Sequence, residues 1–168
     1  MRKALDFLYN SAAALAALFM VGLLAMVLLS IVGRQLHFNV PGTDAYAGYL
    51  MAGAGFLALA HTLKRNEHIR VTLILSSVGP TARRWLERWA MGASAVLAAL
   101  FAFFSVRLVI NSHAFNDIST GNDATALWIP QLAMAIGTVI LAIATIDEFI
   151  LEWRGRVVTQ PTEALRHE

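Results

Sequence analysis

The sequence contains no cysteine among its 168 residues. Disulfide bonds, thiolate metal sites and thiol nucleophiles are therefore excluded. The sequence also lacks a Ser-His-Asp order, a phosphate-binding loop and a spacing typical of metal ligands. We therefore expect neither an enzyme nor a protein with a resident cofactor or metal.

Charged residues are scarce as well. They make up 14% of the chain and apolar residues 58%, whereas soluble globular domains average about 25% charged residues. This excludes an ordinary soluble domain and favours a membrane protein. The net charge of +2 does not indicate a nucleic-acid partner, because the basic residues flank apolar runs instead of lining a polar face. We expect them to meet the lipid bilayer.

Four apolar runs are long enough to cross a bilayer, which takes about 20 residues. They cover residues 11–32, 45–63, 90–110 and 127–146 of a single membrane domain, 1–168, whose tail starts at 147. The first run could be a cleaved signal peptide, but its 22 uncharged residues exceed the usual apolar region of about 7–15. We predict an all-α integral membrane protein with four transmembrane helices.

A shorter apolar stripe between the second and third runs predicts an amphipathic interfacial helix over residues 69–78. Its apolar residues follow helical spacing: Val71, Ile74, Leu75 and Val78. A buried strand is the alternative, but lipid does not tolerate an unpaired strand edge. Gly79 and Pro80 end the stripe, and Pro80 suits the first turn of the next helix. There Trp85 and Trp89 share a face and are candidate interfacial anchors.

The distribution of basic residues predicts the orientation of these helices. Four spans place both termini on one side, and only Arg34 and Arg107 fall on the other. Eleven basic residues lie on the side of the termini: Arg2, Lys3, Lys64, Arg65, Arg70, Arg83, Arg84, Arg88, Arg154, Arg156 and Arg166. Because cytoplasmic loops carry the excess of Lys and Arg, we predict that both termini are cytoplasmic.

No apolar run carries an ionisable residue in its middle. Carriers and channels use such residues, or paired helix breaks, along their pathway, so this chain alone is not expected to conduct a substrate. Arg107 lies near the end of its run, from where it can reach the interface. His61 and His113 lie at opposite ends of their runs, most of a bilayer apart, and cannot ligate one haem iron. His37 and His113 lie on the same side of the membrane. Both are in or beside connections, so ordinary surface histidines are favoured over metal or haem ligands.

Small residues recur along the faces of the runs. The second run has Gly48, Ala52 and Gly55 on one face, and the third has a similar series: Gly92, Ala95, Ala99 and Ala102. Small side chains let helix backbones approach closely in lipid. Internal packing of four helices accounts for most of these positions. A partner membrane subunit is the alternative use of this surface.

Several loose motifs occur in order along the chain. They lie in VGRQLHFNVPGTDAYAGYL, in KRNEHIRVTLIL and in IPQLAMAIGTVILAI. Their main residues are Arg34 closing the first run, Asp44 opening the second, Lys64 with His68, Ile69 and Val71 after it, and Ile129 with Pro130 opening the fourth. With this pattern, from Asp6 to about Glu152, the chain resembles the small membrane subunit of tripartite ATP-independent periplasmic (TRAP) transporters, the DctQ-like family. It departs from that pattern in having Asp44 in place of Glu, and Met51 and Ala52 where an aromatic is expected.

The resemblance implies a sodium-coupled symport complex in the bacterial inner membrane that takes up a small organic acid. It implies two protein partners, a large membrane subunit that carries substrate and sodium, and a periplasmic substrate-binding protein that docks transiently. The small subunit would act as a scaffold without a cofactor of its own. Residues 35–44 and 111–125 would face the binding protein. The candidate contact or structural residues are Arg34, Asp44, His68, Asp117, Asp123 and Pro130.

Two other functions compete with this one. A membrane-anchor or electron-transfer subunit of a respiratory-type complex would carry a pigment or a soluble catalytic partner. A self-assembling channel or drug exporter would work without partners.

Overall fold

The computed structural model describes residues 2–38, 40–64 and 79–153, and over these residues the chain is built of helices. The helices are α1 (Arg2–Gln35), α2 (Thr43–Lys64), α4 (Pro80–Ala114) and α5 (Trp128–Trp153). An apolar run in lipid must satisfy its backbone polar groups within itself, and a helix does so. Each predicted run lies within one helix, apart from Leu127 just before α5. The all-α prediction is confirmed.

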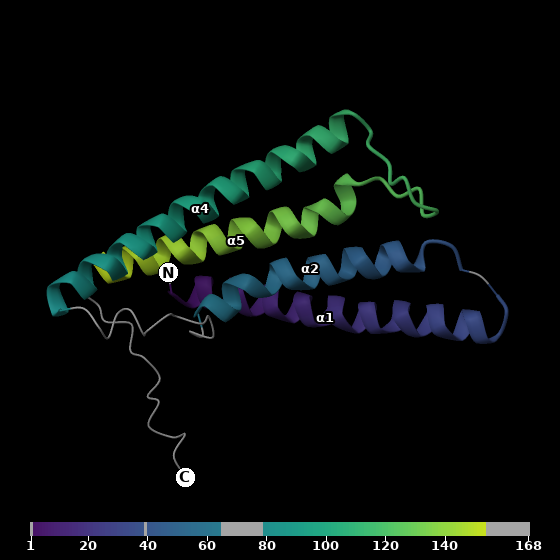
Figure 1. Cartoon of the computed structure of the whole chain (residues 1–168), viewed down its shortest axis with the longest axis horizontal. Helices are drawn as coiled ribbons and strands as arrows, with labels where there is room; N and C mark the ends of the chain where they lie inside the picture. The colour runs from purple at the N-terminus through teal and green to yellow at the C-terminus, as the bar shows by residue number, and fades with distance from the viewer. Residues whose placement is uncertain (1, 39, 65–78, 154–168) are drawn as a thin grey trace, which may run out of the picture.

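The helices form two antiparallel hairpins that pack side by side in the order α1, α2, α5, α4 (Figure 1). α5 lies between α2 and α4, although it follows both in sequence. The start of α1 and the end of α5 lie at one end of the bundle, which we call the terminal end (Figure 1). The α1–α2 turn and the α4–α5 loop, residues 115–127, lie at the opposite end, the loop end.

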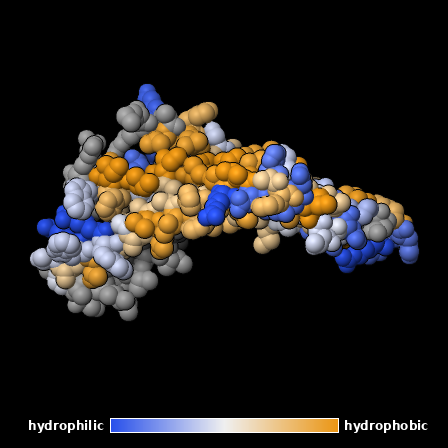
Figure 2. Space-filling model, turned by 90° about the horizontal axis from the view of Figure 1, so that it is seen from above, coloured by the Kyte–Doolittle hydropathy of each residue, from blue (hydrophilic) through white to orange (hydrophobic). Residues whose placement is uncertain are grey.

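Within the described residues, three helices are long and apolar enough to cross a membrane: Leu5–Gln35, Thr81–Ala114 and Trp128–Leu151. Hydrophobic residues cover most of the middle of the face seen in Figure 2, and hydrophilic residues gather toward its two ends. α2 is not among the three. Besides Gly, Thr and Tyr residues, it has Asp44 in its first turn and His61 and Lys64 in its last turn. Its 22 residues are about 33 Å long, close to the thickness of the hydrocarbon core. The crossing of α2 stays a prediction.

The two hairpins meet where α2 and α5 approach most closely. A Cβ placed on Gly137 of α5 would lie 2.5 Å from the carbonyl carbon and oxygen of Phe56 in α2. A Cβ on Gly53 of α2 would lie 2.5 Å from the ring of Phe19 and 3.2 Å from Ala133. Because a larger residue would displace a neighbour at either place, small residues here serve the internal packing of the bundle.

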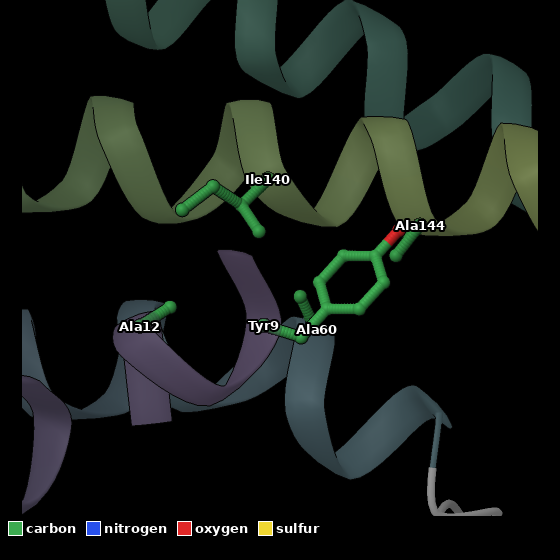
Figure 3. Packing of buried hydrophobic residues seen from close by; sticks show 5 residues of the cluster. All are labelled: Tyr9, Ala12, Ala60, Ile140 and Ala144. Atoms are coloured by element: carbon green, nitrogen blue, oxygen red, sulfur yellow. The ribbon is translucent and has the colours of Figure 1, made fainter. Parts of the chain in front are cut away.

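Tyr9 fastens α1 to α5 at the terminal end. Its side chain is 1% exposed and packs with four buried residues: Ala12, Ala60, Ile140 and Ala144. In Figure 3 the ring crosses from α1 toward α5, and the hydroxyl lies beside Ala144. Lys64 of α2 contacts α1 at the same end: its Nζ lies 2.6 Å from Asp6 Oδ1 and 4.5 Å from the centre of the Tyr9 ring. These contacts join α1, α2 and α5 into one unit.

Helix ends differ in part from the sequence-based expectations. α4 begins at Pro80, which lies in the first turn as predicted, and Gly79 is its capping residue. α5 continues past residue 147 to Trp153, and the start of the cytoplasmic tail at residue 147 stays a prediction. The predicted interfacial helix 69–78, with Val71, Ile74, Leu75 and Val78, lies outside the described residues, as do His68 and residues 154–168.

Candidate functional site

The α4–α5 loop at the loop end has a defined backbone conformation. The amide of Ser119 donates to the carbonyl of Thr125 at 2.8 Å, and the amide of Leu127 donates to the carbonyl of Asp117 at 2.9 Å. Ile118 and Ala126 form an antiparallel bridge between the two arms. The loop therefore presents one surface, with Phe115 and Ile118 exposed by 77% and 62%.

Asp123 fastens this loop to α2. The Tyr49 hydroxyl donates to Asp123 Oδ2 at 3.0 Å, and the Ser119 hydroxyl donates to Oδ1 at 2.8 Å. Beside them, the Thr125 hydroxyl donates to the Tyr46 hydroxyl oxygen at 3.0 Å. We call these five residues the loop clasp. Both carboxylate oxygens of Asp123 are thus occupied within the chain.

The loop clasp also rests on the α1–α2 turn. Gly42 has φ +84°, a conformation that favours glycine, and a Cβ there would lie 2.9 Å from the Cβ of Asp123. Asp123 therefore packs directly on the turn while its carboxylate holds α2. The turn, the start of α2 and the α4–α5 loop form one continuous surface.

The hydrogen bonds of the loop clasp control the ionisation of Asp123. The pKa of Asp123 is lowered from 3.8 to about 2. The Ser119 hydroxyl has the largest effect, the Thr125 and Tyr49 hydroxyls add to it, and desolvation acts in the opposite direction by raising the pKa. Because the pKa is lower in the folded loop, ionisation of Asp123 stabilises the loop above the unfolded value of 3.8. That contribution is lost as the pH falls through about 2.

We expect the carboxyl carbon of Asp123 to titrate with a midpoint near pH 2. Carbon-13 NMR of selectively labelled protein measures this midpoint. Ser119→Ala should raise it toward 3.8, because the hydroxyl with the largest effect is removed. An unchanged midpoint in Ser119→Ala would contradict the assigned cause.

The other loop-end candidates lie around this surface. Asp44 and Asp117 are exposed, in the first turn of α2 and in the loop. Arg34 and Asp44 line one small polar pocket of about 100 Å³, but no ion pair joins them within the described residues. Pro130 lies in the first turn of α5, where its missing N–H is tolerated. The structure thus brings Arg34, Asp44, Asp117 and Asp123 to one end.

Trp85 and Trp89 lie at the terminal end and are 71% and 73% exposed. Trp153 is 68% exposed there too, with the Arg88 guanidinium 5.9 Å from its ring centre. Exposed indoles and basic side chains at one level are typical of a membrane boundary. The anchoring role of Trp85 and Trp89 stays a prediction.

His61 and His113 lie at opposite ends of the bundle. His61 is in the last turn of α2 at the terminal end, and His113 is in the last turn of α4 at the loop end (Figure 1). The His113 ring packs edge-on against Trp128, with ring centres 5.3 Å apart.

The sequence alone did not single out Tyr46, Tyr49, Ser119 or Thr125, the four residues that join Asp123 in the loop clasp. Their contacts join residues as many as 79 positions apart. The available signal was local, namely two tyrosines three residues apart directly after a Pro-Gly turn.

One face of α2 remains open. A Cβ on Gly48 or Gly55 would meet no other atom within 4 Å, and Ala52 between them is exposed. Met51 beside them is 66% exposed. The same helix therefore has one small-residue face packed inside the bundle and a second facing outward.

A family comparison identifies what this arrangement belongs to. The model of the family described as "Tripartite ATP-independent periplasmic transporters, DctQ component" matches residues 23–155. The chain belongs to the DctQ family. Among curated proteins, none matches it. The matched stretch contains the loop clasp and the open face of α2, so both features lie within the DctQ part of the chain. The DctQ chain is thus a multi-pass membrane component of a transporter.

Proposed function

We propose that this DctQ chain is the small permease subunit of a TRAP transporter, and that it braces a large membrane subunit that carries sodium and a small organic acid. The open face of α2 carries this proposal. Gly48, Ala52 and Gly55 leave room for the backbone of another helix, and close backbone approach is how helices associate in lipid. α2 lies between two apolar helices, α1 and α5, so we place it across the membrane with them.

The distribution of charge supports a bracing role. Between Asp6 and Arg34 in α1, between Asp44 and His61 in α2, and from Trp128 to Ile146 in α5, the sequence has no Asp, Glu, Lys, Arg or His. α4 has none from Trp89 to Val106. A pathway for sodium or an organic acid needs polar groups at that depth. We therefore assign the pathway to the large subunit.

The loop end supports a second part of the proposal, the docking of a periplasmic binding protein. Asp44 and Asp117 are exposed, whereas Asp123 holds the loop in place. Phe38, Phe115 and Ile118 add exposed apolar area beside these acids. We propose that Asp44 and Asp117 contact the binding protein and that the loop clasp fixes the surface on which they stand. The loop end would then face the periplasm, with both chain termini cytoplasmic in the inner membrane.

The test of the bracing role places a large side chain on the open face. Ala52→Leu should reduce co-purification of the co-expressed large subunit by at least about tenfold, because the added branch keeps the helix backbones apart. Ala99→Leu is the matched control, since Ala99 is also exposed but lies on α4. We expect near-normal recovery with this variant.

Uptake into vesicles provides the second measurement. With the large subunit, the binding protein and a sodium gradient present, Ala52→Leu should lower organic acid uptake in proportion to lost complex. Vesicles holding the DctQ chain alone serve as the blank. Uptake by the chain alone, or full recovery of the large subunit with Ala52→Leu, would overturn the proposed function.

A further inference from the structure

An apolar groove runs along the outside of α4 near the loop end. Its volume is about 410 Å³, within the range of about 300–1,000 Å³ usual for small-molecule pockets. Five of its six lining residues are apolar, and the sixth is an arginine: Ala102, Phe103, Val106, Arg107, Ile110 and Val139. Ala102 and Ile110 are eight residues apart, so the groove follows about 12 Å of the helix.

Arg107 has no anionic partner within the described part of the chain. The ion pairs found there join Lys64 to Asp6 and Arg83 to Glu87. The Arg107 side chain is exposed beside the groove. A cation among apolar groups in a membrane is costly unless an anion or water reaches it.

The depth of Arg107 indicates which anion is available. Arg107 lies within the apolar helix Thr81–Ala114, seven residues before the end of α4, which places its Cα about 10 Å below the helix end. It is the only Asp, Glu, Lys or Arg between Arg88 and Asp117. An arginine at this depth extends its guanidinium toward the boundary while its stem stays in the apolar layer. Phospholipid phosphates occupy that boundary around every transmembrane helix.

We propose that Arg107 and this groove form a binding site for one phospholipid of the loop-end leaflet. An acyl chain lies in the groove, and the phosphate accepts two hydrogen bonds from the guanidinium. The acyl chain matches the apolar lining of the groove. The phosphate matches the guanidinium, because two N–H groups of Arg can donate in parallel to two phosphate oxygens. A non-helical segment of a protein partner fits less well, because the lining offers no polar side chain other than Arg107 for its backbone groups.

The position of the groove gives the bound lipid a role. α4 is at the edge of the row of helices, and among the described helices its backbone packs against α5 alone. A lipid held between α4 and Val139 of α5 fills the space on the outer side of that contact. It would fix the depth of α4 in the membrane and cover the apolar groove.

Native mass spectrometry of the full chain with added phosphatidylglycerol tests this site. Arg107→Gln should weaken retention of the most tightly held lipid by about tenfold, because a pair of charge-assisted hydrogen bonds is lost. Arg107→Lys should retain part of the affinity, since a point charge remains without the planar fork. Val106→Trp should also reduce retention by filling the groove with the guanidinium intact.

Arg34→Gln is the control, because Arg34 lies at the same end but lines the polar pocket beside Asp44. It should leave retention unchanged. Circular dichroism checks that each variant keeps its helical content. If Arg107→Gln does not fold, the retention of lipid by Arg107→Lys and Val106→Trp tests the site in its place. Equal retention by wild type, Arg107→Gln and Val106→Trp would overturn the site. So would normal retention by Arg107→Gln together with loss of the large subunit, because the anion would then be a protein carboxylate.

Discussion

Gly137→Ala is expected to separate the two hairpins of the bundle. The new Cβ would lie 2.5 Å from the backbone carbonyl of Phe56, and a backbone group cannot turn aside as a side chain can. α2 and α5 must then move apart, which loosens the contacts along their shared length. We expect a loss of about 1–3 kcal/mol in the free energy of unfolding, the usual cost of overpacking.

Two further glycines of α2 give a graded series. Gly53→Ala places a Cβ against the ring of Phe19, whose side chain can rotate, so a smaller loss is expected. Gly55→Ala meets no atom within 4 Å. It should be neutral or slightly stabilising in the isolated chain, because alanine favours helix over glycine by about 0.5–1 kcal/mol.

Unfolding of the purified chain by sodium dodecyl sulfate, followed by circular dichroism, measures the series. The expected order of destabilisation is Gly137→Ala, then Gly53→Ala, then Gly55→Ala. Equal stability of the Gly137 and Gly55 variants would show that α2 and α5 are not in close backbone contact.

Asp123→Ala is expected to release the α4–α5 loop and to lower binding-protein-dependent uptake by at least about tenfold. When the docking surface is misplaced, most encounters with the binding protein no longer lead to productive docking. The carboxylate holds Tyr49 and Ser119, and its removal leaves both hydroxyls without their acceptor. Asp117→Ala removes the same charge from an exposed position in the same loop. It should leave the loop in place and weaken only the docking contact.

The absence of cysteine makes the loop position straightforward to measure. Spin labels on Leu36→Cys and Thr120→Cys, both at exposed positions, report the distance between the turn and the loop by pulsed electron spin resonance. The distribution should broaden with Asp123→Ala and stay narrow with Asp117→Ala. A narrow distribution in both, with uptake lost in both, would assign Asp123 to direct docking instead of loop positioning.

The helices could be predicted from the sequence because each is a long apolar run, and lipid permits such a run only a self-satisfied backbone. The order α1, α2, α5, α4 could not. Small residues occur on several faces of several runs, and nothing in their spacing distinguishes Gly53, which packs internally, from Gly48 and Gly55, which face outward. The close approach at Gly137 likewise depends on where Phe56 lies in another helix.

The candidate site was predictable only as a side of the membrane. The alternation of four spans predicts that Asp44, Asp117 and Asp123 share one side, and the structure does bring them to one end. Their different roles depend on partners distant in sequence, since Tyr49 and Asp123 are 74 positions apart. Arg107 was noted for its position near the end of a run, but the groove beside it requires Val139 from α5.

The position of α5 in the row bears on how the protein is made. The ribosome completes α1, α2 and α4 before α5, yet α5 is the helix that contacts both α2 and α4. The α1–α2 hairpin and α4 are therefore synthesised before α5, the helix that packs between them. A chain that stops before residue 128 would lack the helix that packs against both α2 and α4, and the faces that α5 covers would meet lipid instead.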